Sequence, residues 1–281
     1  MTGLLYVVAT PIGNLEDISA RAIKVLSQVN RIAAEDTRHS SRLLQHLGIN
    51  TPLVAVHDHN EAGRVQSLIE QLVAGERIAL ISDAGTPLIS DPGYRLIRAA
   101  IENHIQVKVI PGPSAVTTAL LLSGLPSDRF CFEGFLPRTS GARISALEDL
   151  ASEERTLIFF EAPHRLVETM EDFQKVFGPD REGAICREIT KTYEEVIRGP
   201  IKDLIKWAKA KEILGEITLV MGGFASNKEF SVEDLISEVL KYEAAGISRK
   251  EAIAEVAKVT GVAKRQVFDA MVEHKSSEGK V

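Results

Sequence analysis

Cysteine is scarce in this chain of 281 residues, and the features of membrane and secreted proteins are missing. The two cysteines, Cys131 and Cys186, each lie in an apolar run, so we expect reduced core thiols and no disulfide. No apolar run approaches the roughly 20 residues that span a bilayer, and no basic segment precedes the first strand-like residues. These absences predict a cytoplasmic protein without a signal peptide or a membrane span.

Positive charge is also in deficit, because 33 lysine and arginine residues are set against 39 aspartate and glutamate residues, a net charge of −6. This balance argues against polyanion binding over the whole surface, although it allows a local basic patch. The motif G-x-G-x-x-G does not open the first helix, and G-x-x-x-x-G-K-[ST] and G-x-S-x-G are missing. Ordinary dinucleotide binding, P-loop phosphate transfer and a hydrolase nucleophile elbow are therefore disfavoured.

The most informative stretch that is present runs from Ala79 to Gly93, ALISDAGTPLISDPG. An apolar run typical of a buried parallel strand ends at Asp83, and a loop rich in glycine and proline follows. Ligands bind beyond the carboxyl ends of parallel strands, where Gly85 permits close backbone approach and Asp83 can orient a cationic or hydroxylated group. A well-punctuated strand-to-helix turn without a ligand is the plainer alternative.

Strands and helices alternate through the first part of the chain, which predicts a parallel sheet with right-handed crossovers. Ser19 can cap the first helix, and Ser40 or Ser41 is expected to start the second. Polar clusters follow four strands, at residues 11–14, 35–39, 57–61 and 83–91. Because the carboxyl ends of parallel strands share one edge of the sheet, we expect these clusters to form a single site.

The segment PGPS at residues 111–114 interrupts the alternation and indicates a domain junction. Beyond it the strand patterns have mixed spacing, which predicts a mixed sheet, and from about Ser231 the pattern is entirely helical. The three short helices are compatible with a helix-turn-helix bundle, whose third helix opens with Lys264 and Arg265, or with a packing appendage. The sequence therefore predicts two α/β domains, 1–112 and 113–225, and a helical extension, 230–281.

Two polar clusters offer catalytic groups. His57 and His59 alternate as on a strand, so they can serve as a base, bind substrate, hold a metal or remain solvated. No third or fourth ligand is set by the spacing, and we therefore predict no metal. Asp36 offers a carboxylate base and Arg38 a guanidinium that can form a bidentate contact with phosphate, unless the two belong to an internal salt-bridge cluster.

Eight motifs in collinear order resemble the ribosomal RNA small subunit methyltransferase I family, a branch of the tetrapyrrole methylase superfamily. They are TPIGNLEDIS, AEDTRHS, HDHNE, SDAGTPLISDPG, PGPSA, FEGFLPR, FEAPHR and REITKTYEE. The resemblance implies a tetrapyrrole-methylase-like α/β fold with S-adenosylmethionine in the cleft between two domains, and a homodimer. It also implies 2′-O-methylation of a cytidine in the 16S ribosomal RNA of the small subunit.

The resemblance further implies which residues contact the cofactor. They are Pro11, Ala84, Gly85, Thr86, Ile89, Ser114, Ala115, Glu161 and Ile189, with Asp83 added as the carboxylate at the strand end. Many tetrapyrrole methylases carry Gly-x-Gly-Pro-Gly-Asp after the first strand, whereas this chain reads ATPIGN, with Asn14 in the position of the acid. This departure argues against a tetrapyrrole substrate and agrees with the RNA branch.

Methyl transfer to a ribose hydroxyl requires alignment of the reacting atoms and removal of one proton, and it requires no metal. The residues expected to assist deprotonation are Asp36, His57 and His59, and those expected to bind RNA are Arg38, Asn60, Arg138 and Arg143. Two alternatives remain open at this point. One is a small-molecule, tetrapyrrole-like methyltransferase with an enclosed apolar cavity, and the other is a non-catalytic module that binds adenosylmethionine or RNA.

Overall fold

The structure is a computed structural model that describes residues 3–56, 61–224, 231–260 and 262–278. The chain forms two compact units, Met1–Phe224 and Ala225–Val281, each with a hydrophobic core of its own. Within the described residues, no helix is both long and apolar enough to cross a membrane.

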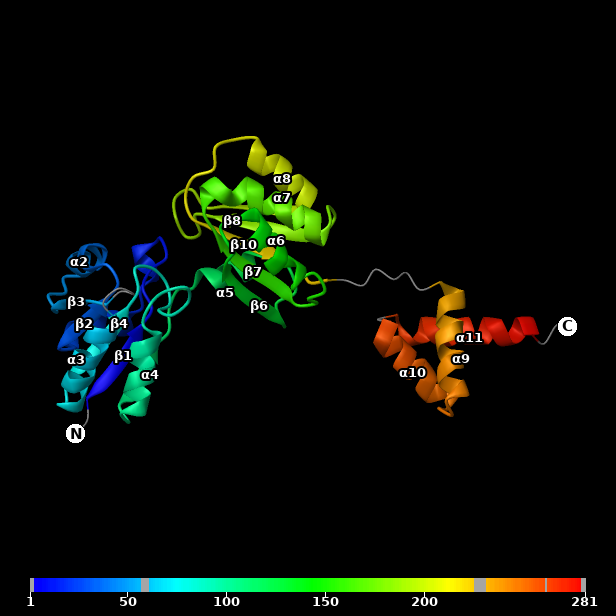
Figure 1. Cartoon of the computed structure of the whole chain (residues 1–281), viewed down its shortest axis with the longest axis horizontal. Helices are drawn as coiled ribbons and strands as arrows, with labels where there is room; N and C mark the ends of the chain where they lie inside the picture. The colour runs from blue at the N-terminus through cyan, green and yellow to red at the C-terminus, as the bar shows by residue number, and fades with distance from the viewer. Residues whose placement is uncertain (1–2, 57–60, 225–230, 261, 279–281) are drawn as a thin grey trace. The chain divides into compact units, whose positions relative to one another are not determined.

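A five-stranded parallel sheet forms the first part of the larger unit, as the alternation of strands and helices predicts (Figure 1). Its strands are β1 (Leu4–Val8), β2 (Arg31–Ala34), β3 (Leu53–Ala55), β4 (Arg77–Ile81) and β5 (Gln106–Ile110), in the order β3-β2-β4-β1-β5. Helices α1 (Ala20–Gln28) and α2 (Thr37–His46) pack on one face, and α3 (Glu61–Val73) and α4 (Tyr94–Glu102) on the other. A short 3-10 helix, η1 (Leu15–Asp17), precedes α1.

Strand β4 shows why this sheet is buried on both faces. Its residues Ile78 and Leu80 enter the core beneath α3 and α4, whereas Ala79 and Ile81 enter the core beneath α1 and α2. Side chains alternate between the two faces of a strand, so an unbroken apolar run is what a doubly covered strand requires. The apolar run in the sequence is thereby explained.

The start of α1 is as expected, but the start of α2 is not. The Ser19 hydroxyl accepts a hydrogen bond from Ala22 N at 3.1 Å, which satisfies a free N–H group of the first turn. Helix α2 begins at Thr37, three or four residues earlier than predicted, because the Asp36 carboxylate accepts from Arg38 N at 2.8 Å and caps it. Ser40 consequently lies inside the helix and is buried.

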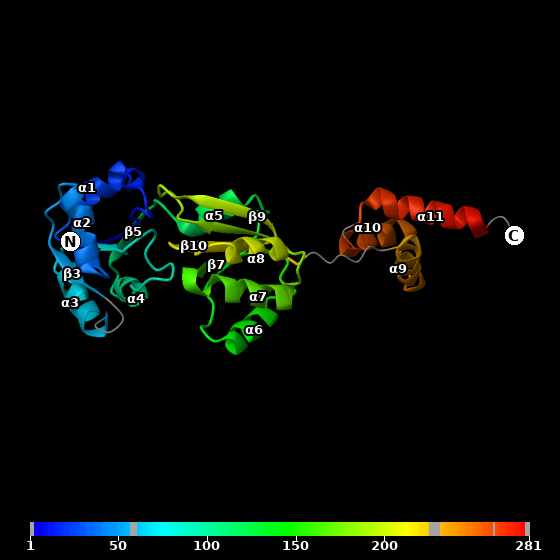
Figure 2. The ribbon, with the colours of Figure 1, turned by 90° about the horizontal axis from the view of Figure 1, so that it is seen from above.

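The second half of the larger unit contains a mixed five-stranded sheet, as predicted. Its strands are β6 (Phe130–Phe135), β7 (Thr156–Glu161), β8 (Glu182–Arg187), β9 (Glu195–Pro200) and β10 (Ile217–Met221), in the order β6-β7-β10-β8-β9. Only the β6–β7 pair is parallel. Helix α5 (Ala115–Ser123) packs on one face; α6 (Ser140–Glu148), α7 (Leu166–Phe177) and α8 (Ile201–Lys209) cover the other, with η2 (Pro163–Arg165) leading into α7 (Figure 2).

The smaller unit consists of three helices, α9 (Val232–Ala244), α10 (Arg249–Thr260) and α11 (Lys264–Glu278). A capping box starts α9, because Ser231 and Asp234 exchange side-chain-to-backbone hydrogen bonds. Leu235, Val239 and Ile253 lie in a buried apolar cluster that joins the helices. The helical pattern read from the sequence is therefore present.

Candidate active site

Hydrogen bonds join the loops at the carboxyl ends of β1, β2 and β4. Thr10 and Gly85 form an isolated antiparallel bridge, with Thr10 N donating to Gly85 O at 2.8 Å and Gly85 N donating to Thr10 O at 3.1 Å. The Asp36 backbone N–H donates to the Asp83 carboxylate at 3.2 Å. Three of the polar clusters that follow strands thus meet at one edge of the sheet.

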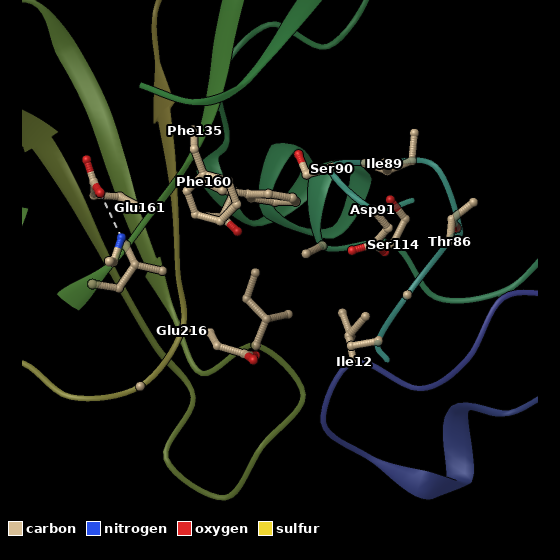
Figure 3. A pocket seen from close by; sticks show the side chains of 18 of the residues that line it. Ile12, Thr86, Ile89, Ser90, Asp91, Ser114, Phe135, Phe160, Glu161 and Glu216 are labelled. Carbon is tan, nitrogen blue, oxygen red and sulfur yellow. Dashed lines mark hydrogen bonds between the residues drawn. The ribbon is translucent and has the colours of Figure 1, made fainter. Parts of the chain in front are cut away.

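A cavity of about 370 Å³ lies between this edge and the second sheet (Figure 3). Its size falls within the range of small-molecule and cofactor sites. The lining residues come from both halves of the larger unit: Ile12, Ala84, Gly85, Thr86, Ile89, Ser90, Asp91, Ser114, Ala115, Phe135, Phe160, Glu161, Ala162, Pro163, Ile189, Gly215, Glu216, Ile217 and Thr218.

The polar part of the lining is acidic. Among the described residues that line the cavity, Asp91, Glu161 and Glu216 carry carboxylates, and none carries a cationic side chain. A cavity lined in this way favours a ligand with positive charge, because opposite charges attract most strongly where water is partly excluded. A sulfonium donor fits this requirement.

Two of these carboxylates already have protein partners. Glu161 is buried and accepts hydrogen bonds from Ala162 N at 2.8 Å and from the Thr169 hydroxyl at 2.5 Å. Glu216 is bound to Lys191 Nζ at 2.9 Å and its side chain is 74% exposed. Glu161 therefore shapes the wall of the cavity, whereas Glu216 lies at its open side.

The remaining wall is apolar and partly aromatic. The rings of Phe135 and Phe160 lie 5.5 Å apart and tilted, and Ile12 and Ile189 add aliphatic surface from the two halves of the unit. Flat apolar and aromatic surfaces of this kind suit a heterocyclic base. The cavity thus combines an apolar surface that suits a heterocyclic ring with carboxylates in its polar lining.

Backbone strain concentrates in two loops around the cavity. Leu88 and Ser90 have φ of 75° and 64°, and Glu188 and Thr190 have φ of 51° and 67°. Non-glycine residues in this left-handed region cost about 1–3 kcal/mol each and occur mostly at functional sites. The strained residues flank Ile89 and Ile189, which line the cavity, so the strain lies beside the cavity.

Most residues predicted to contact the cofactor line the cavity. They are Ala84, Gly85, Thr86, Ile89, Ser114, Ala115, Glu161 and Ile189. Pro11 does not line it, although its neighbour Ile12 does. Asp83 does not line it either, because its carboxylate turns to the backbone N–H of Asp36.

Other lining residues are not among the predicted cofactor contacts, although Ile12, Ser90 and Asp91 lie within the predicted polar clusters. They are Ile12, Ser90, Asp91, Phe135, Phe160, Ala162, Pro163, Gly215, Glu216, Ile217 and Thr218. Ser90 and Asp91 lie in the same loop as Gly85, so the density of polar residues there was an available signal. The segment at Gly215 carries no such signal, because it precedes the strand β10 and does not follow one.

The predicted catalytic residues fall into two groups. His57 and His59, together with the predicted substrate residue Asn60, lie outside the described residues. Asp36 does not line the cavity, and hydrogen bonds from the Arg38 side chain and backbone lower the pKa of its carboxyl to about 2. A carboxylate of such low basicity is a weak proton acceptor near neutral pH. We therefore expect Asp36 to cap α2 and not to act as the base.

The arginines predicted to bind RNA differ in their exposure. The side chain of Arg38 is 88% exposed, and Arg138 is also exposed. Arg143 is only 1% exposed and forms an ion pair with buried Asp172 at 2.7 Å. The expectation that Arg143 binds RNA is therefore wrong, because its guanidinium is turned into the core from helix α6.

The thiols are free, as expected, and burial raises the pKa of Cys186 to about 12. Within the described part of the chain, no group of three or more histidine, cysteine, aspartate or glutamate residues is placed to hold a metal ion.

Comparison with known proteins identifies the class of this fold and site. A family model described as tetrapyrrole (corrin/porphyrin) methylases matches residues 4–205. Among solved structures, the methyltransferase CobJ is similar with a TM-score of 0.60 and 17% identity over 80% of this chain and 95% of that one. Diphthine synthase is similar with a TM-score of 0.58 and 15% identity over 78% of this chain and 89% of that one. These likenesses establish the fold alone.

The sequence relatives are much closer in identity. Ribosomal RNA small subunit methyltransferase I of Pasteurella multocida is 46% identical over 98% of both chains. The protein of that name from Escherichia coli O157:H7 is 47% identical over 96% of this chain and 95% of its own. The protein of that name from Mycobacterium tuberculosis is 46% identical over 99% of this chain and 98% of its own.

The fold, the acidic cavity and the family model together define an S-adenosylmethionine-dependent methyltransferase of the tetrapyrrole methylase class. Within that class, the chain belongs to the ribosomal RNA small subunit methyltransferase I family.

Proposed function

We propose that this protein transfers a methyl group from S-adenosylmethionine to the 2′-hydroxyl of a cytidine in the 16S ribosomal RNA of the small subunit. Membership of the family supports the ribosomal RNA substrate, because the relatives carry that substrate in their names. The observation that carries the proposal is the acidic cavity at the edge where the motif loops converge.

When bound, S-adenosylmethionine supplies an electrophilic methyl group. The loop after β4, which contains Gly85, and the second sheet, which contributes Phe160, would hold the donor between them, because both line the cavity. Fixing both reactants in line can supply roughly 7–11 kcal/mol of the barrier. The apolar walls formed by Phe135, Ile12 and Ile189 would pack against the heterocyclic base of the donor.

The 2′-hydroxyl must lose a proton as it is methylated, and we propose His57 or His59 as the acceptor. Imidazole has an ordinary pKa near neutrality, which suits a general base. Replacing each histidine in turn with alanine should lower kcat by about 10²–10⁴-fold for at least one of them. Asp36→Asn should leave kcat within about threefold of the original, since asparagine also caps helices well. Single-turnover rates with saturating donor measure these effects. Near-normal rates for both histidine variants, or a hundredfold loss for Asp36→Asn, would contradict the assignment.

RNA binding is proposed to depend on the exposed guanidinium groups of Arg38 and Arg138. Removing one phosphate contact should weaken RNA binding and reduce the slope of log K against log salt by about 0.7–0.9. We therefore expect Arg38→Ala and Arg138→Ala each to show both effects in fluorescence anisotropy titrations at several salt concentrations. Arg98→Ala is the matched control, because Arg98 is 63% exposed and paired with Glu102 on α4. An unchanged salt slope in both variants would remove these residues from the interface.

The decisive test of the proposed function is a transfer assay with a labelled methyl donor and three acceptors: assembled 30S particles, naked 16S RNA and a tetrapyrrole. Label in ribose of the RNA, resistant to alkaline cleavage at the modified nucleotide, is the expected result. Label in the tetrapyrrole alone would favour the small-molecule alternative. Binding of donor and RNA without transfer to any acceptor would favour the non-catalytic module.

We also propose that the protein acts in the cytoplasm as a homodimer, and that the larger unit is divided into domains 1–112 and 113–225. The division is supported by the two separate sheets that the unit contains. The dimer is supported by the family resemblance, and light scattering of the purified chain tests it through the molecular mass.

A further inference from the structure

The loop at residues 136–139, which joins β6 to α6, is held from its inner side by an arginine of another segment. Arg165 Nη2 donates to Leu136 O at 3.0 Å and to Pro137 O at 2.8 Å. The side chain of Arg165 is only 14% exposed, whereas Pro137 and Arg138 are exposed. A largely buried guanidinium therefore supports an exposed loop.

The hydrogen bonds of Arg165 go to this loop and not to the carboxylate beside it. Glu161 Oε1 lies 3.4 Å from Arg165 Nε, but that nitrogen makes no hydrogen bond within the part of the chain that the structure describes. Glu161 takes its hydrogen bonds from Ala162 N and the Thr169 hydroxyl. Arginine and carboxylate often form two parallel hydrogen bonds, and that arrangement is given up here. Glu161 therefore receives positive charge from Arg165, while the loop receives its hydrogen bonds.

The supported loop lies beside the cavity. Phe135 directly precedes the loop and lines the cavity. Glu161 and Pro163, which precede Arg165, line it too. Figure 3 shows Phe135 and Glu161 on the same side of the cavity, across from Thr86. A nucleotide whose ribose reaches the cavity has a phosphate on either side, and a cation fixed next to the cavity can bind one of them.

Arg138 is the cation that the loop offers. Its side chain is exposed and makes no ion pair with the described residues. The residues before it restrict the loop, because Leu136 is buried and Pro137 has a fixed φ. Arg143 Nη1 also donates to Arg138 O, but at 3.4 Å this bond is longer than the usual range. Arg165 is therefore the main support of the loop.

We propose that Arg165 is a positioning residue for RNA binding, which fixes the loop so that Arg138 meets a phosphate of the ribosomal RNA beside the cavity. The inference rests on the proposed contact between Arg138 and RNA. A loop that is fixed before binding loses little conformational freedom when the RNA arrives, so its affinity is higher. Arg165 acts through Arg138 and contacts neither the RNA nor the donor.

The variant Arg165→Lys separates this role from the charge beside Glu161. Lysine keeps the charge but ends one atom short of the Nη2 position, so it loses the reach to both carbonyl groups. The full chain should bind labelled naked 16S RNA about 3–10-fold more weakly. The slope of log K against log salt should fall by up to about 0.7–0.9, as for Arg138→Ala. Because the variant has the same net charge as the original protein, a lower slope reports displacement of Arg138.

The same variant should keep its affinity for S-adenosylmethionine within twofold in calorimetric titrations. In steady-state transfer assays, KM for the RNA should rise while kcat stays within twofold. Arg181→Lys is the matched control, because the Arg181 guanidinium also donates to backbone carbonyl groups, those of Gly222 and Ala151, outside the cavity lining. The control should bind RNA within twofold of the original protein even where it lowers the melting temperature.

A double variant decides whether Arg165 acts through Arg138. Arg165→Lys combined with Arg138→Ala should bind RNA no more weakly than Arg138→Ala alone, because the contact that Arg165 positions is already gone. Additive losses would overturn the inference. A similar loss in Arg181→Lys would overturn it too, since general loosening of the unit would then explain the effect. Weakened donor binding by Arg165→Lys would assign this arginine to the cavity wall instead.

Arg165→Met removes every donor of the side chain and keeps the test decisive if lysine finds another route to the carbonyl groups. Normal RNA affinity in both Arg165 variants would overturn the positioning role alone, provided that Arg138→Ala binds RNA weakly. Normal RNA affinity in Arg138→Ala would instead refute the proposed contact between Arg138 and RNA, and the positioning role would fail with it.

Discussion

Replacement of Gly85 with valine is expected to lower the affinity for S-adenosylmethionine more than 100-fold, or by more than about 2.7 kcal/mol. Gly85 has φ of +75°, a conformation that β-branched residues avoid. A Cβ atom there would lie 3.1 Å from Ile12 Cγ2 and 3.8 Å from Pro113 O. The γ-methyl groups of valine would therefore displace the cavity wall, and isothermal titration calorimetry measures the loss.

Gly48 provides a matched control for the backbone part of this effect. It has φ of +68°, and nothing lies within 4 Å of its Cβ position. The left-handed conformation should cost Gly48→Val about 1–2 kcal/mol of unfolding free energy, and it should cost Gly85→Val a similar amount. Its affinity for the donor should stay within twofold of the original. A folded Gly85→Val protein with affinity within threefold of the original would refute the placement of the donor beside this loop.

Replacement of Arg143 with methionine is expected to lower the free energy of unfolding by about 3 kcal/mol, the lower end of the range for breaking a buried ion pair. The melting temperature should fall by roughly 6–12 °C in a unit of this size. Arg143 binds Asp172 through Nη2 at 2.7 Å and Nε at 2.8 Å, and both residues are at most 2% exposed. The expected loss of unfolding free energy lies at the lower end of the range because Ser140 and Lys175 also bind Asp172 and remain in place in the variant.

The pH dependence of this loss follows from the pKa of Asp172. Burial raises that pKa. Hydrogen bonds from Lys175, Arg143 and Ser140 together lower it by more than burial raises it, so the net shift is downward. A lowered carboxylate pKa contributes stability above its unfolded value of 3.8, and this contribution is lost as the pH falls through the folded value. The difference in free energy of unfolding between Arg143→Met and the original protein should therefore be largest near pH 7 and shrink below about pH 4. Thermal unfolding at a series of pH values measures it.

Arg138 separates the structural role of Arg143 from a role in RNA binding. Arg138→Ala should leave the melting temperature nearly unchanged while it weakens RNA binding, because its side chain is exposed. Arg143→Met should lower the melting temperature but leave RNA binding nearly unchanged when binding is measured at a temperature where the variant remains folded. Weakened RNA binding by folded Arg143→Met, without a loss of stability, would contradict the burial of this guanidinium.

The elements were predictable where their signals are local. The unbroken apolar run of β4 and the capping serine of α1 identify a buried strand and a helix start, because neighbouring residues create both signals. Helix α2 was predicted to start too late, because Asp36 competes with Ser40 as a cap and the sequence does not rank them.

The site was predictable to the level of loops but not of every side chain. Gly85, Thr86 and Ser114 belong to motifs that follow strands of one sheet, so their convergence follows from the topology. Asp83 and Asp91 are both acids of the same loop, and no sequence signal tells which one faces the cavity. Which of the two faces the cavity depends on the backbone N–H of Asp36, 47 residues from Asp83, which donates a hydrogen bond to the Asp83 carboxylate.

The sequence by itself determined the fold class, the edge of the sheet where the loops meet and the family, because these follow from local patterns and from the order of motifs. Only the tertiary structure decided that Asp91 faces the cavity and that Arg143 is buried. Each of those outcomes depends on partners distant in the chain, such as Asp172, 29 residues from Arg143. A charged side chain is stable in the interior only where such a partner meets it, and the chain must fold before that partner is in reach.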